Sequence, residues 1–317
     1  MYIDLHTDIF WAMAEYKKQF DSQSSIKHID LPRAREGGLL GAFITGYPTT
    51  TSEDINYTLN RWLQITADGK NHLRRIKSVF DVTTLIDDFN SREINQREIG
   101  AIMHLEGAQG IQTFDQLYIY YEIGLRSLGL TWNEENQYAT GQLGNSSRGL
   151  TPQGKDLLDV LESLGIIIDV SHLNDKSFWE VLANTNGPII ASHSNLRKWA
   201  DHKRNLTDEM VLELSKTGGG IGINLCKGFL SVDQTKHPAN RHCAQEMIKE
   251  VVHLIGGYDS VMMGTDFDGC TIVEDIQDVS YMPNFLEELQ NDLSCSTDQL
   301  NNIAYNNIIR IMSKIWK

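Results

Sequence analysis

Histidines and carboxylates recur directly after short apolar segments of this sequence. The first of these segments runs into DLHTD, in which His6 and Asp8 stand two residues apart. Later segments run into Glu106, His172 and His193. Imidazole and carboxylate groups are the ligands that zinc and similar transition metals bind. The residue types therefore indicate metal-assisted chemistry, provided that the fold brings these five side chains together.

The spacing of these residues suggests how they could share metal ions. Residues i and i+2 of a strand point to the same side, so His6 and Asp8 can bind one ion together. Glu106 has two carboxylate oxygens and could connect that ion to a second one, held by His172 and His193. Two cations about 3.5 to 4 Å apart can share a water molecule, lower its pKa and polarise a substrate carbonyl. The pattern is thus compatible with metal-assisted hydrolysis.

Each of these residues also has a purely structural interpretation. A lone His-x-Asp pair is a weak signal, and a single histidine at a strand end is more often a hydrogen-bonded structural residue. Five such groups at one place would, however, crowd several charges together without a metal, and this favours metal binding. His104 should face the same way as Glu106 and is expected, at most, to support the ligands from behind. The other histidines are expected to be surface or hydrogen-bonded residues: His28, His72, His202, His237, His242 and His253.

Short apolar segments alternate with helical patterns along the chain. Between Thr151, a good N-cap, and Gly165, leucines such as Leu157 and Leu161 recur at helical spacing. The segments predicted as strands are residues 2–5, 39–45, 100–105, 127–131, 166–170, 188–191, 219–225 and 260–264. Eight strands alternating with helices, without a G-x-G-x-x-G turn, favour a closed α/β structure, the (β/α)8 TIM barrel, over an open α/β sheet. All strands of such a barrel open at their carboxyl ends on one face, where the candidate ligands would meet.

The composition is that of a folded globular protein. No linker rich in proline, glycine or serine divides the 317 residues, which predicts a single domain over residues 1–317. The net charge of −14 argues against partners such as nucleic acid or an anionic membrane. No apolar run approaches the roughly 18 residues that span a bilayer, and the N-terminal residues lack the features of a signal peptide. A cytoplasmic protein is therefore expected.

The cysteines give no support for a zinc–thiolate site. They form no C-x-x-C pair and are too few for a disulfide framework in a chain of this length. Most of them are expected to be small buried residues: Cys226, Cys243, Cys270 and Cys295. Any metal would then be held by histidine and carboxylate.

Six sequence blocks resemble those of the membrane (renal) dipeptidase family of zinc metallopeptidases, a branch of the amidohydrolase superfamily. The blocks are DLHTD, HLEGA, LTWNEEN, IIIDVSHL, PIIASHSNLRKWADHKRNLTDEM and MGTDFDG, and they run in the family's order from residue 4 to residue 269. The resemblance implies a (β/α)8 barrel with two zinc ions. It also implies hydrolysis of free dipeptides by a hydroxide that bridges these ions, often with tolerance for a D-residue on the C-terminal side, and a homodimer.

The resemblance also implies a role for each candidate residue. His6 and Asp8 would bind the first zinc ion, and His172 and His193 the second. Glu106 would bridge the two ions and so take part in catalysis. Manganese or cobalt could replace zinc.

Three further positions gain an interpretation from the resemblance. Arg204 matches the arginine that receives the C-terminal carboxylate of the dipeptide, although taken alone it would be read as a surface arginine. Asp266 matches the acidic general base that accepts the proton of the attacking water. Asp268 is the less favoured candidate for this role and is read as a structural residue of the turn before Gly269.

Trp132 departs from the best-known pattern of the family. Better-characterised members carry a histidine there, which contacts the carbonyl oxygen of the substrate. An indole N–H can only donate a hydrogen bond and cannot take up a proton. Trp132 is therefore expected to shape the substrate pocket, and the substrate preference stays open.

Two other functions are compatible with the sequence. One is a metal-dependent amidohydrolase that acts on another amide, a lactam or a lactone, because one barrel supports many reactions. The other is a catalytically silent barrel that keeps a metal for stability. The presence of Asp266 argues against the silent barrel, since such a protein needs no group for proton transfer.

Overall fold

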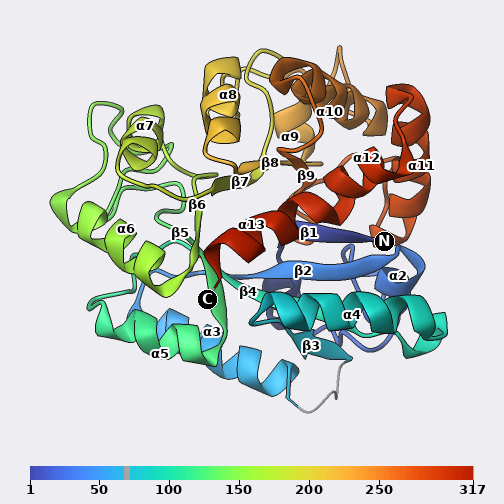
Figure 1. The fold of residues 1–317 in the computed structure, drawn as a ribbon, viewed down its shortest axis with the longest axis horizontal. Coiled ribbons are helices and arrows are strands. Elements are labelled where there is room, and N and C mark those ends of the chain that lie inside the picture. Colours follow the sequence, from blue (N-terminus) through green and yellow to red (C-terminus); the bar gives the residue numbers. More distant parts are fainter. Residues whose placement is uncertain (68–71, 317) are drawn as a thin grey trace.

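The computed structural model describes residues 1–67 and 72–316. Strands alternate with helices along the chain, as Figure 1 shows. The strands are β1 (Tyr2–Thr7), β2 (Leu39–Gly46), β3 (Leu73–Arg75), β4 (Ile99–Glu106), β5 (Leu125–Gly129), β6 (Ile167–Asp169), β7 (Ile189–Ser194), β8 (Gly220–Ile223) and β9 (Val261–Met263).

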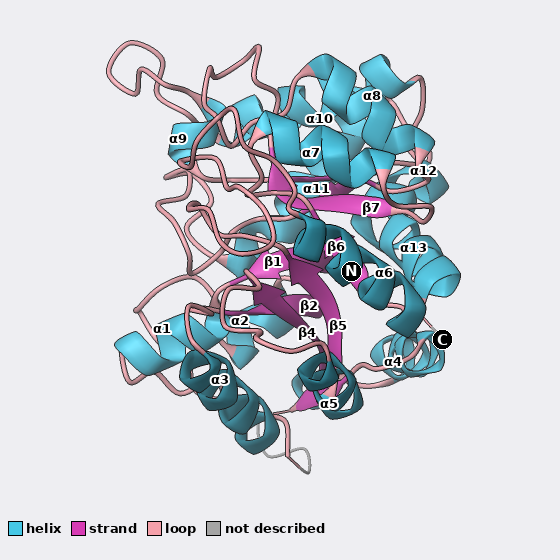
Figure 2. Cartoon of the chain, turned by 90° about the vertical axis from the view of Figure 1, so that its left-hand side faces the viewer, coloured by secondary structure: helices cyan, strands magenta, loops and turns pink. Residues whose placement is uncertain are grey.

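The α-helices lie outside the sheet, and Figure 2 shows many of the connecting loops gathered on one side of it. The helices are α1 (Ile9–Glu15), α2 (Leu31–Glu36), α3 (Ser52–Ile65), α4 (Val79–Ser91), α5 (Asp115–Ile123), α6 (Pro152–Leu164), α7 (Asp175–Ala183), α8 (Asp208–Lys216), α9 (Lys227–Leu230), α10 (Arg241–Ile255), α11 (Met282–Leu293), α12 (Thr297–Asn301) and α13 (Asn307–Ile315). Short helical turns of other kinds are η1 (Ile94–Gln96), η2 (Val279–Tyr281) and η3 (Asn302–Asn306). In the described part of the chain, no helix has both the length and the apolar character required to cross a membrane.

The sheet is a closed parallel barrel. Its strands follow the order β2-β1-β9-β8-β7-β6-β5-β4, and pairing between β2 and β4 joins the two ends. Every one of these neighbouring strand pairs is parallel. The prediction of a (β/α)8 TIM barrel is therefore confirmed, and the open sheet is excluded.

The short strand β3 was not expected from the sequence. It pairs with β4 at Ile99–Ala101, just before the stretch of β4 that pairs with β5 from Met103 onward. β3 thus adds to the amino-terminal end of β4 without entering the barrel. Its three residues include Arg74 and Arg75, so no apolar run marks it as a strand.

Local sequence signals explain where the helices begin and end. The side chain of Thr151 accepts a hydrogen bond from the Gly154 N–H at the start of α6, and Gly165 closes the helix with φ 78°. Thr51 and Ser78 form capping boxes at the starts of α3 and α4. The observed ends of α6, at Thr151 and Gly165, match the boundaries that the residue pattern predicts for this helix.

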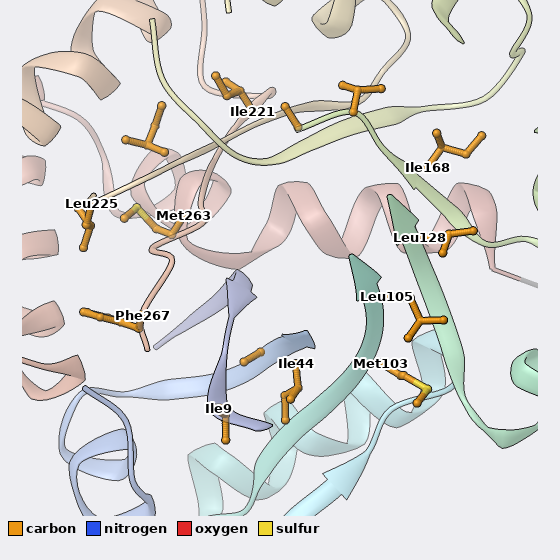
Figure 3. Close-up of a cluster of buried hydrophobic side chains, with 14 of the residues drawn as sticks. Ile9, Ile44, Met103, Leu105, Leu128, Ile168, Ile221, Leu225, Met263 and Phe267 are labelled. Carbon is orange, nitrogen blue, oxygen red and sulfur yellow. The ribbon is translucent and has the colours of Figure 1, made fainter. Parts of the chain in front are cut away.

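Alternation along β4 separates the core from the site. Met103 and Leu105 belong to a large buried apolar cluster that also contains Trp62 of α3 (Figure 3). His104 and Glu106, one residue further along in each case, face the polar side of the strand. One face of β4 therefore packs into the apolar core, and the opposite face, apolar at Ile102, becomes polar toward the carboxyl end of the strand.

At two glycines, Gly222 and Gly264, the backbones of neighbouring segments approach each other very closely beside the candidate site. A Cβ atom at Gly264 would lie 1.8 Å from the carbonyl oxygen of Ser192, and one at Gly222 would lie 2.0 Å from the same atom. Backbone cannot move aside as a side-chain end can. We expect Gly264→Ala to lower the free energy of unfolding by about 1 to 3 kcal/mol, measured by urea titration.

Gly257 provides the matched control for this substitution. No heavy atom lies within 4 Å of a Cβ atom built at Gly257. Gly257→Ala should therefore leave the urea midpoint close to that of the parent protein. Equal stability of the two variants would contradict the close-packing argument.

Candidate metal centre

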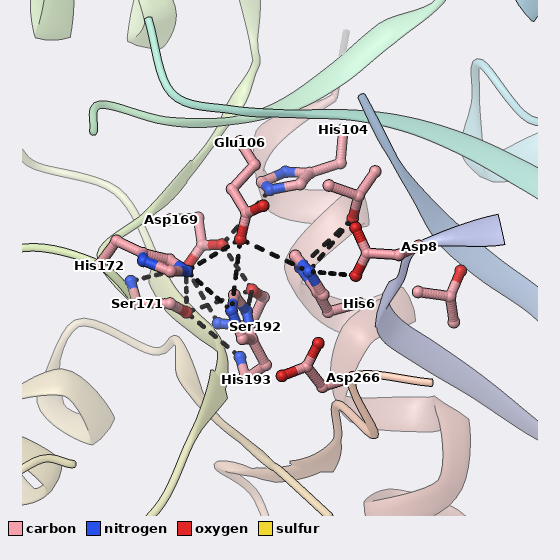
Figure 4. A network of polar contacts seen from close by, with 12 residues as sticks. His6, Asp8, His104, Glu106, Asp169, Ser171, His172, Ser192, His193 and Asp266 are labelled. Atoms are coloured by element: carbon pink, nitrogen blue, oxygen red, sulfur yellow. Dashed lines mark hydrogen bonds and ion pairs between the residues drawn. The ribbon is translucent and has the colours of Figure 1, made fainter. Parts of the chain in front are cut away.

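The five candidate ligands lie together at the carboxyl ends of their strands, as Figure 4 shows. His6, Glu106 and His193 belong to β1, β4 and β7, whereas Asp8 and His172 come shortly after β1 and β6. All five side chains are buried. The barrel thus assembles one cluster from four distant parts of the sequence.

Three imidazoles face one carboxylate oxygen in this cluster. Glu106 Oε1 lies 2.8 Å from His172 Nε2 and 3.5 Å from the Nε2 atoms of His6 and His193. The Nε2 atoms of His172 and His193 are 3.1 Å apart, and His6 Nε2 is 3.4 Å from Asp8 Oδ2. Nitrogen and carboxylate oxygen donors at such mutual distances fit a borderline divalent metal such as zinc.

Hydrogen bonds behind the cluster determine which ring nitrogen is free. His172 Nδ1 lies 2.9 Å from Asn133 Oδ1, an acceptor, so Nδ1 carries the proton. The hydroxyl of Ser192 donates its own hydrogen bond to Asp169 and lies 2.7 Å from His193 Nδ1. Its oxygen therefore accepts a hydrogen bond from the Nδ1–H of His193. Both histidines therefore present the lone pair of Nε2 toward Glu106, as a metal ligand must.

Asp169 anchors this supporting network from below. It accepts hydrogen bonds from Ser171 Oγ at 2.7 Å and from the Ser192 N–H at 3.0 Å. His104 is fully buried, with Nε2 3.6 Å from Asp169 Oδ2 and Nδ1 3.0 Å from Ser127 Oγ. Asp169, at the end of β6, thus fixes Ser192, which in turn orients His193.

The electrostatics of the cluster call for a positive charge. Burial opposes a charge on His6, but Glu106 and Asp8 outweigh it and raise the pKa of His6 to about 10. Burial acts to raise the pKa of Glu106, yet His6 and His172 bring it down to about 2. Burial, together with Arg204, lowers the pKa of His172 to about 4. A bound cation would supply the charge that His6 otherwise carries and would keep the imidazoles neutral.

Asp266 lies beside this cluster on the turn after β9. Its N–H donates to the His6 carbonyl at 3.2 Å, and the Asp8 N–H donates to the Phe267 carbonyl at 2.9 Å, so the ends of β1 and β9 are joined. Ligand atoms of His6, Asp8 and Asp266 lie within 4.8 Å of one another. Burial raises the pKa of Asp266 to about 6, although His6 opposes the shift. Asn224 Nδ2 donates to Asp266 Oδ2 at 3.0 Å and orients the carboxylate.

Asp268 faces a different environment from Asp266. It is fully buried, and its Oδ1 accepts a hydrogen bond from the His28 N–H at 2.6 Å. Its N–H donates to His28 Nδ1 at 2.8 Å, and its Oδ2 lies 3.6 Å from Lys18 Nζ. These contacts attach the turn that carries Asp266 to the segment before α2.

A cavity of about 530 Å³ opens above the cluster. Arg204 lines it and is only 3% exposed, unlike the surface arginine that its residue type alone would suggest. Its guanidinium donates to the carbonyl oxygens of Ser171 and, at 3.3 Å, of His193. Trp132 also lines the cavity and is 41% exposed, with its ring 6.2 Å from that of His172.

Several residues of the cavity were not predicted from the sequence. His202 lines the cavity instead of the outer surface, with its ring 4.7 Å from that of Phe229 and its Nδ1 3.1 Å from the Arg204 N–H. The loop between β7 and α8 folds back through a bridge between Leu196 and Leu206, and this carries His202 inward. The signal in the sequence that could have placed His202 in the cavity is its position two residues before Arg204, the predicted substrate-binding residue. The other unexpected lining residues are Trp11, Tyr47, Asn133, Gln142, Leu143, Phe229, Gly269 and Cys270.

The expectation that most cysteines are buried was wrong. Cys295 is buried, whereas Cys226, Cys243 and Cys270 are partly exposed. Cys226 and Cys270 lie in loops beyond strand ends, and Cys243 lies in the first turn of α10; the apolar core covers Cys243 and Cys270 only in part.

Comparisons with known proteins agree with the geometry. The family model described as membrane dipeptidase (peptidase family M19), the family that the sequence blocks resemble, matches residues 1–317. An uncharacterised dipeptidase of Schizosaccharomyces pombe is 26% identical over 336 aligned positions, which cover 99% of this chain and 80% of the relative.

Two solved structures share the fold over nearly their whole length. A metallopeptidase from Rhodobacter sphaeroides, liganded with a phosphinate mimic of the dipeptide L-Ala-D-Ala, superimposes with a TM-score of 0.87 at 24% identity, covering 99% of each chain. A structure described as a dipeptidase and metallopeptidase gives a TM-score of 0.87 at 25% identity, covering 99% of this chain and 98% of the other.

The contact between His28 and Asp268 should make the stability of the fold depend on pH. Burial, followed by Lys27 and Lys18, lowers the pKa of His28 from 6.5 to about 4, and the neutral ring accepts the Asp268 N–H. The unfolded chain therefore binds this proton more readily than the folded protein. The contribution to stability is complete above pH 6.5 and is lost as the pH falls toward 4, by up to about 3 kcal/mol.

His28→Asn separates this effect from other titrations. Asparagine can still accept the hydrogen bond but does not titrate. Urea unfolding at neutral pH and at about pH 4.5 should show a smaller acid loss of stability in the variant than in the parent. Identical pH dependence of the two proteins would show that His28 is not kept neutral by the fold.

Proposed function

The chain belongs to the membrane dipeptidase family of metallopeptidases, and from this premise we propose that it hydrolyses the peptide bond of free dipeptides. The position of Arg204 carries the proposal. This buried guanidinium lines the same cavity as the histidine–carboxylate cluster. A guanidinium can hold a carboxylate through two parallel hydrogen bonds. A substrate held in this way would place a peptide bond near the cluster only if that bond is close to its C-terminus.

We assign five side chains to two metal ions, with zinc as the fitting metal. His6 and Asp8 would hold one ion, His172 and His193 the other, and Glu106 would contact both. When bound, two such ions supply a water of lowered pKa and polarise the carbonyl of the substrate. The free Nε2 lone pairs of His172 and His193 support this assignment, because the protonated Nδ1 of each ring is already bonded elsewhere.

Asp266 is our candidate for proton transfer. Its carboxylate lies beside His6 and Asp8, and its pKa of about 6 is close to the pH at which a general base works best. It would accept the proton of the attacking water and pass it to the leaving amine. Asp268 is not suited to this role, since its carboxylate is occupied by His28 and Lys18.

Trp132 and the size of the cavity bear on the choice of dipeptide. The indole N–H can donate a hydrogen bond but cannot exchange a proton, so we give Trp132 a role in shaping the pocket, together with Tyr47, whose ring is 5.1 Å away. A volume of about 530 Å³ suits a small ligand. The Rhodobacter sphaeroides metallopeptidase was solved with a mimic of L-Ala-D-Ala. By analogy we extend the proposal to dipeptides with a C-terminal D-residue. From the family resemblance we also propose a homodimer as the working form.

Metal analysis combined with a substrate panel tests the proposed function. The purified protein should carry about two zinc ions per chain and hydrolyse the dipeptides L-Ala-L-Ala and L-Ala-D-Ala. It should not hydrolyse tripeptides of alanine. A chelator should abolish turnover, and added zinc should restore it. Preferential turnover of a lactone or lactam would assign a different amidohydrolase activity, and a metal-free protein without turnover would indicate a silent barrel.

Substitution of Arg204 tests how the substrate is recognised. Arg204→Ala should lower kcat/KM for dipeptides by about 100-fold or more, because it removes the partner of a buried carboxylate. Dipeptide amides, which lack that carboxylate, should be poor substrates of the parent protein and should lose little further in the variant.

Arg197 of the same loop supplies the control. It forms an ion pair with Asp175 whose Nη2–Oδ1 distance is 2.7 Å, and Asp175 is largely exposed, so Arg197→Ala should change kcat/KM little. Full dipeptidase activity of Arg204→Ala would refute the assignment to free dipeptides.

A further inference from the structure

Two cysteines from neighbouring strands meet beside Asp266. Cys226 comes shortly after β8, and Cys270 lies on the loop after β9. Their sulfur atoms and a carboxylate oxygen of Asp266 all lie within 4.8 Å of one another. The cysteines have no motif spacing in the sequence, so only the pairing of β8 with β9 reveals the cluster.

The backbone fixes the relative position of the two cysteines. Cys226 forms an isolated antiparallel bridge with Ile272, and backbone hydrogen bonds of 3.0 and 3.2 Å flank that bridge. The side chain of Asn224 accepts the Cys226 N–H at 2.7 Å and donates to Asp266 Oδ2 at 3.0 Å. One asparagine therefore holds both the cysteine segment and the carboxylate in register.

The chemistry of this cluster differs from that of the five-residue cluster. Two sulfur atoms and one carboxylate oxygen favour a soft or borderline d¹⁰ cation such as cadmium or zinc. Three protein ligands leave one position open for water. Cys270 and Asp266 line the cavity, so an ion that enters the cavity can reach two of the three ligands directly.

We propose that Cys226, Cys270 and Asp266 form a separate thiolate site for a thiophilic divalent cation, and that occupation of this site inhibits the enzyme. The inhibition rests on the proposed function, because the cation would take Asp266 away from proton transfer. The binding of the cation does not rest on it.

The environment of Cys270 favours a cation over a disulfide bond. Burial, a hydrogen bond with Cys226 and the nearby charge of Asp266 raise the pKa of the Cys270 thiol well above its usual value. A thiol that stays protonated is a poor nucleophile for disulfide formation. A cation instead brings the positive charge that stabilises two thiolates beside a carboxylate.

Cadmium binding to the zinc-loaded protein tests the site directly. Sulfur-to-cadmium charge transfer gives an ultraviolet absorption band, and none of the five residues assigned to the zinc ions contains sulfur. Displacement of zinc by cadmium would therefore give no band, whereas binding to Cys226 and Cys270 would. We expect a band that saturates at about one equivalent of cadmium. Each of the variants Cys226→Ser and Cys270→Ser should lose the band and bind cadmium at least about 10-fold more weakly than the parent protein.

Cys243→Ser is the matched control, because Cys243 is also partly exposed but lies in α10 outside this cluster. It should retain the full band. Alkylation by iodoacetamide, followed by mass spectrometry, gives a second measurement that needs no variant. Cadmium should protect Cys226 of the parent protein and leave Cys243 reactive, whereas the protonated Cys270 thiol should react slowly in both conditions.

The outcomes separate this site from the proposed function. Absence of the band, its persistence in both serine variants, or equal alkylation of Cys226 with and without cadmium would overturn the site. Dipeptide hydrolysis should fall in parallel with the growth of the band. Full activity at saturation of the band would overturn the inhibitory role. A protein that shows the band but hydrolyses no dipeptide would keep the cation site and refute the proposed function.

Discussion

The crowding of three carboxylates in a small buried volume is the constraint on which the rest of the site depends. Asp8, Glu106 and Asp266 all lie at the carboxyl ends of strands, shielded from water. Negative charges in such a place repel each other and lose hydration, so they persist only beside compensating positive charge. In the protein chain alone, His6 supplies that charge, and its pKa of about 10 reflects the requirement. Burial lowers the pKa of His172 and His193, and hydrogen bonds from Asp169 through Ser192 align the His193 ring. The cluster is therefore prepared for a cation before one arrives.

The sequence predicted the barrel because its physical signals are local. Short apolar runs alternate with capped helices, and eight of the strands follow from that pattern, with boundaries displaced by a few residues. Strand β3 was not predicted, because two of its three residues are arginines. The meeting of His6, Asp8, Glu106, His172 and His193 followed from one rule of barrel topology, namely that strand ends share a face. This rule applies to residues near strand ends and does not extend to long loops.

The parts of the site that could not be predicted are those that depend on loop conformation. His202 enters the cavity only because the loop after β7 folds back through Leu196 and Leu206. Cys226 and Cys270 meet only because a short antiparallel bridge forms beyond two parallel strands. Arg204 could be given a role only by resemblance to a family, since no residue pattern distinguishes a buried arginine on a loop from an exposed one. Loop contacts of this kind join residues that are far apart in the sequence and leave no periodic signal.

The join between β1 and β9 has a consequence for how the protein matures. His6 and Asp8 precede Asp266 and Phe267 by about 260 residues in the sequence, yet the backbones of the two segments are hydrogen-bonded to each other. His6 and Asp8 are therefore synthesised long before the residues that lie beside them in the cluster. Helix α13 lengthens this delay, because Ile308 and Ile311 pack in the same apolar cluster as Ile3 and Leu5 of β1. The complete cluster can therefore form only after the chain has been synthesised at least as far as Asp266.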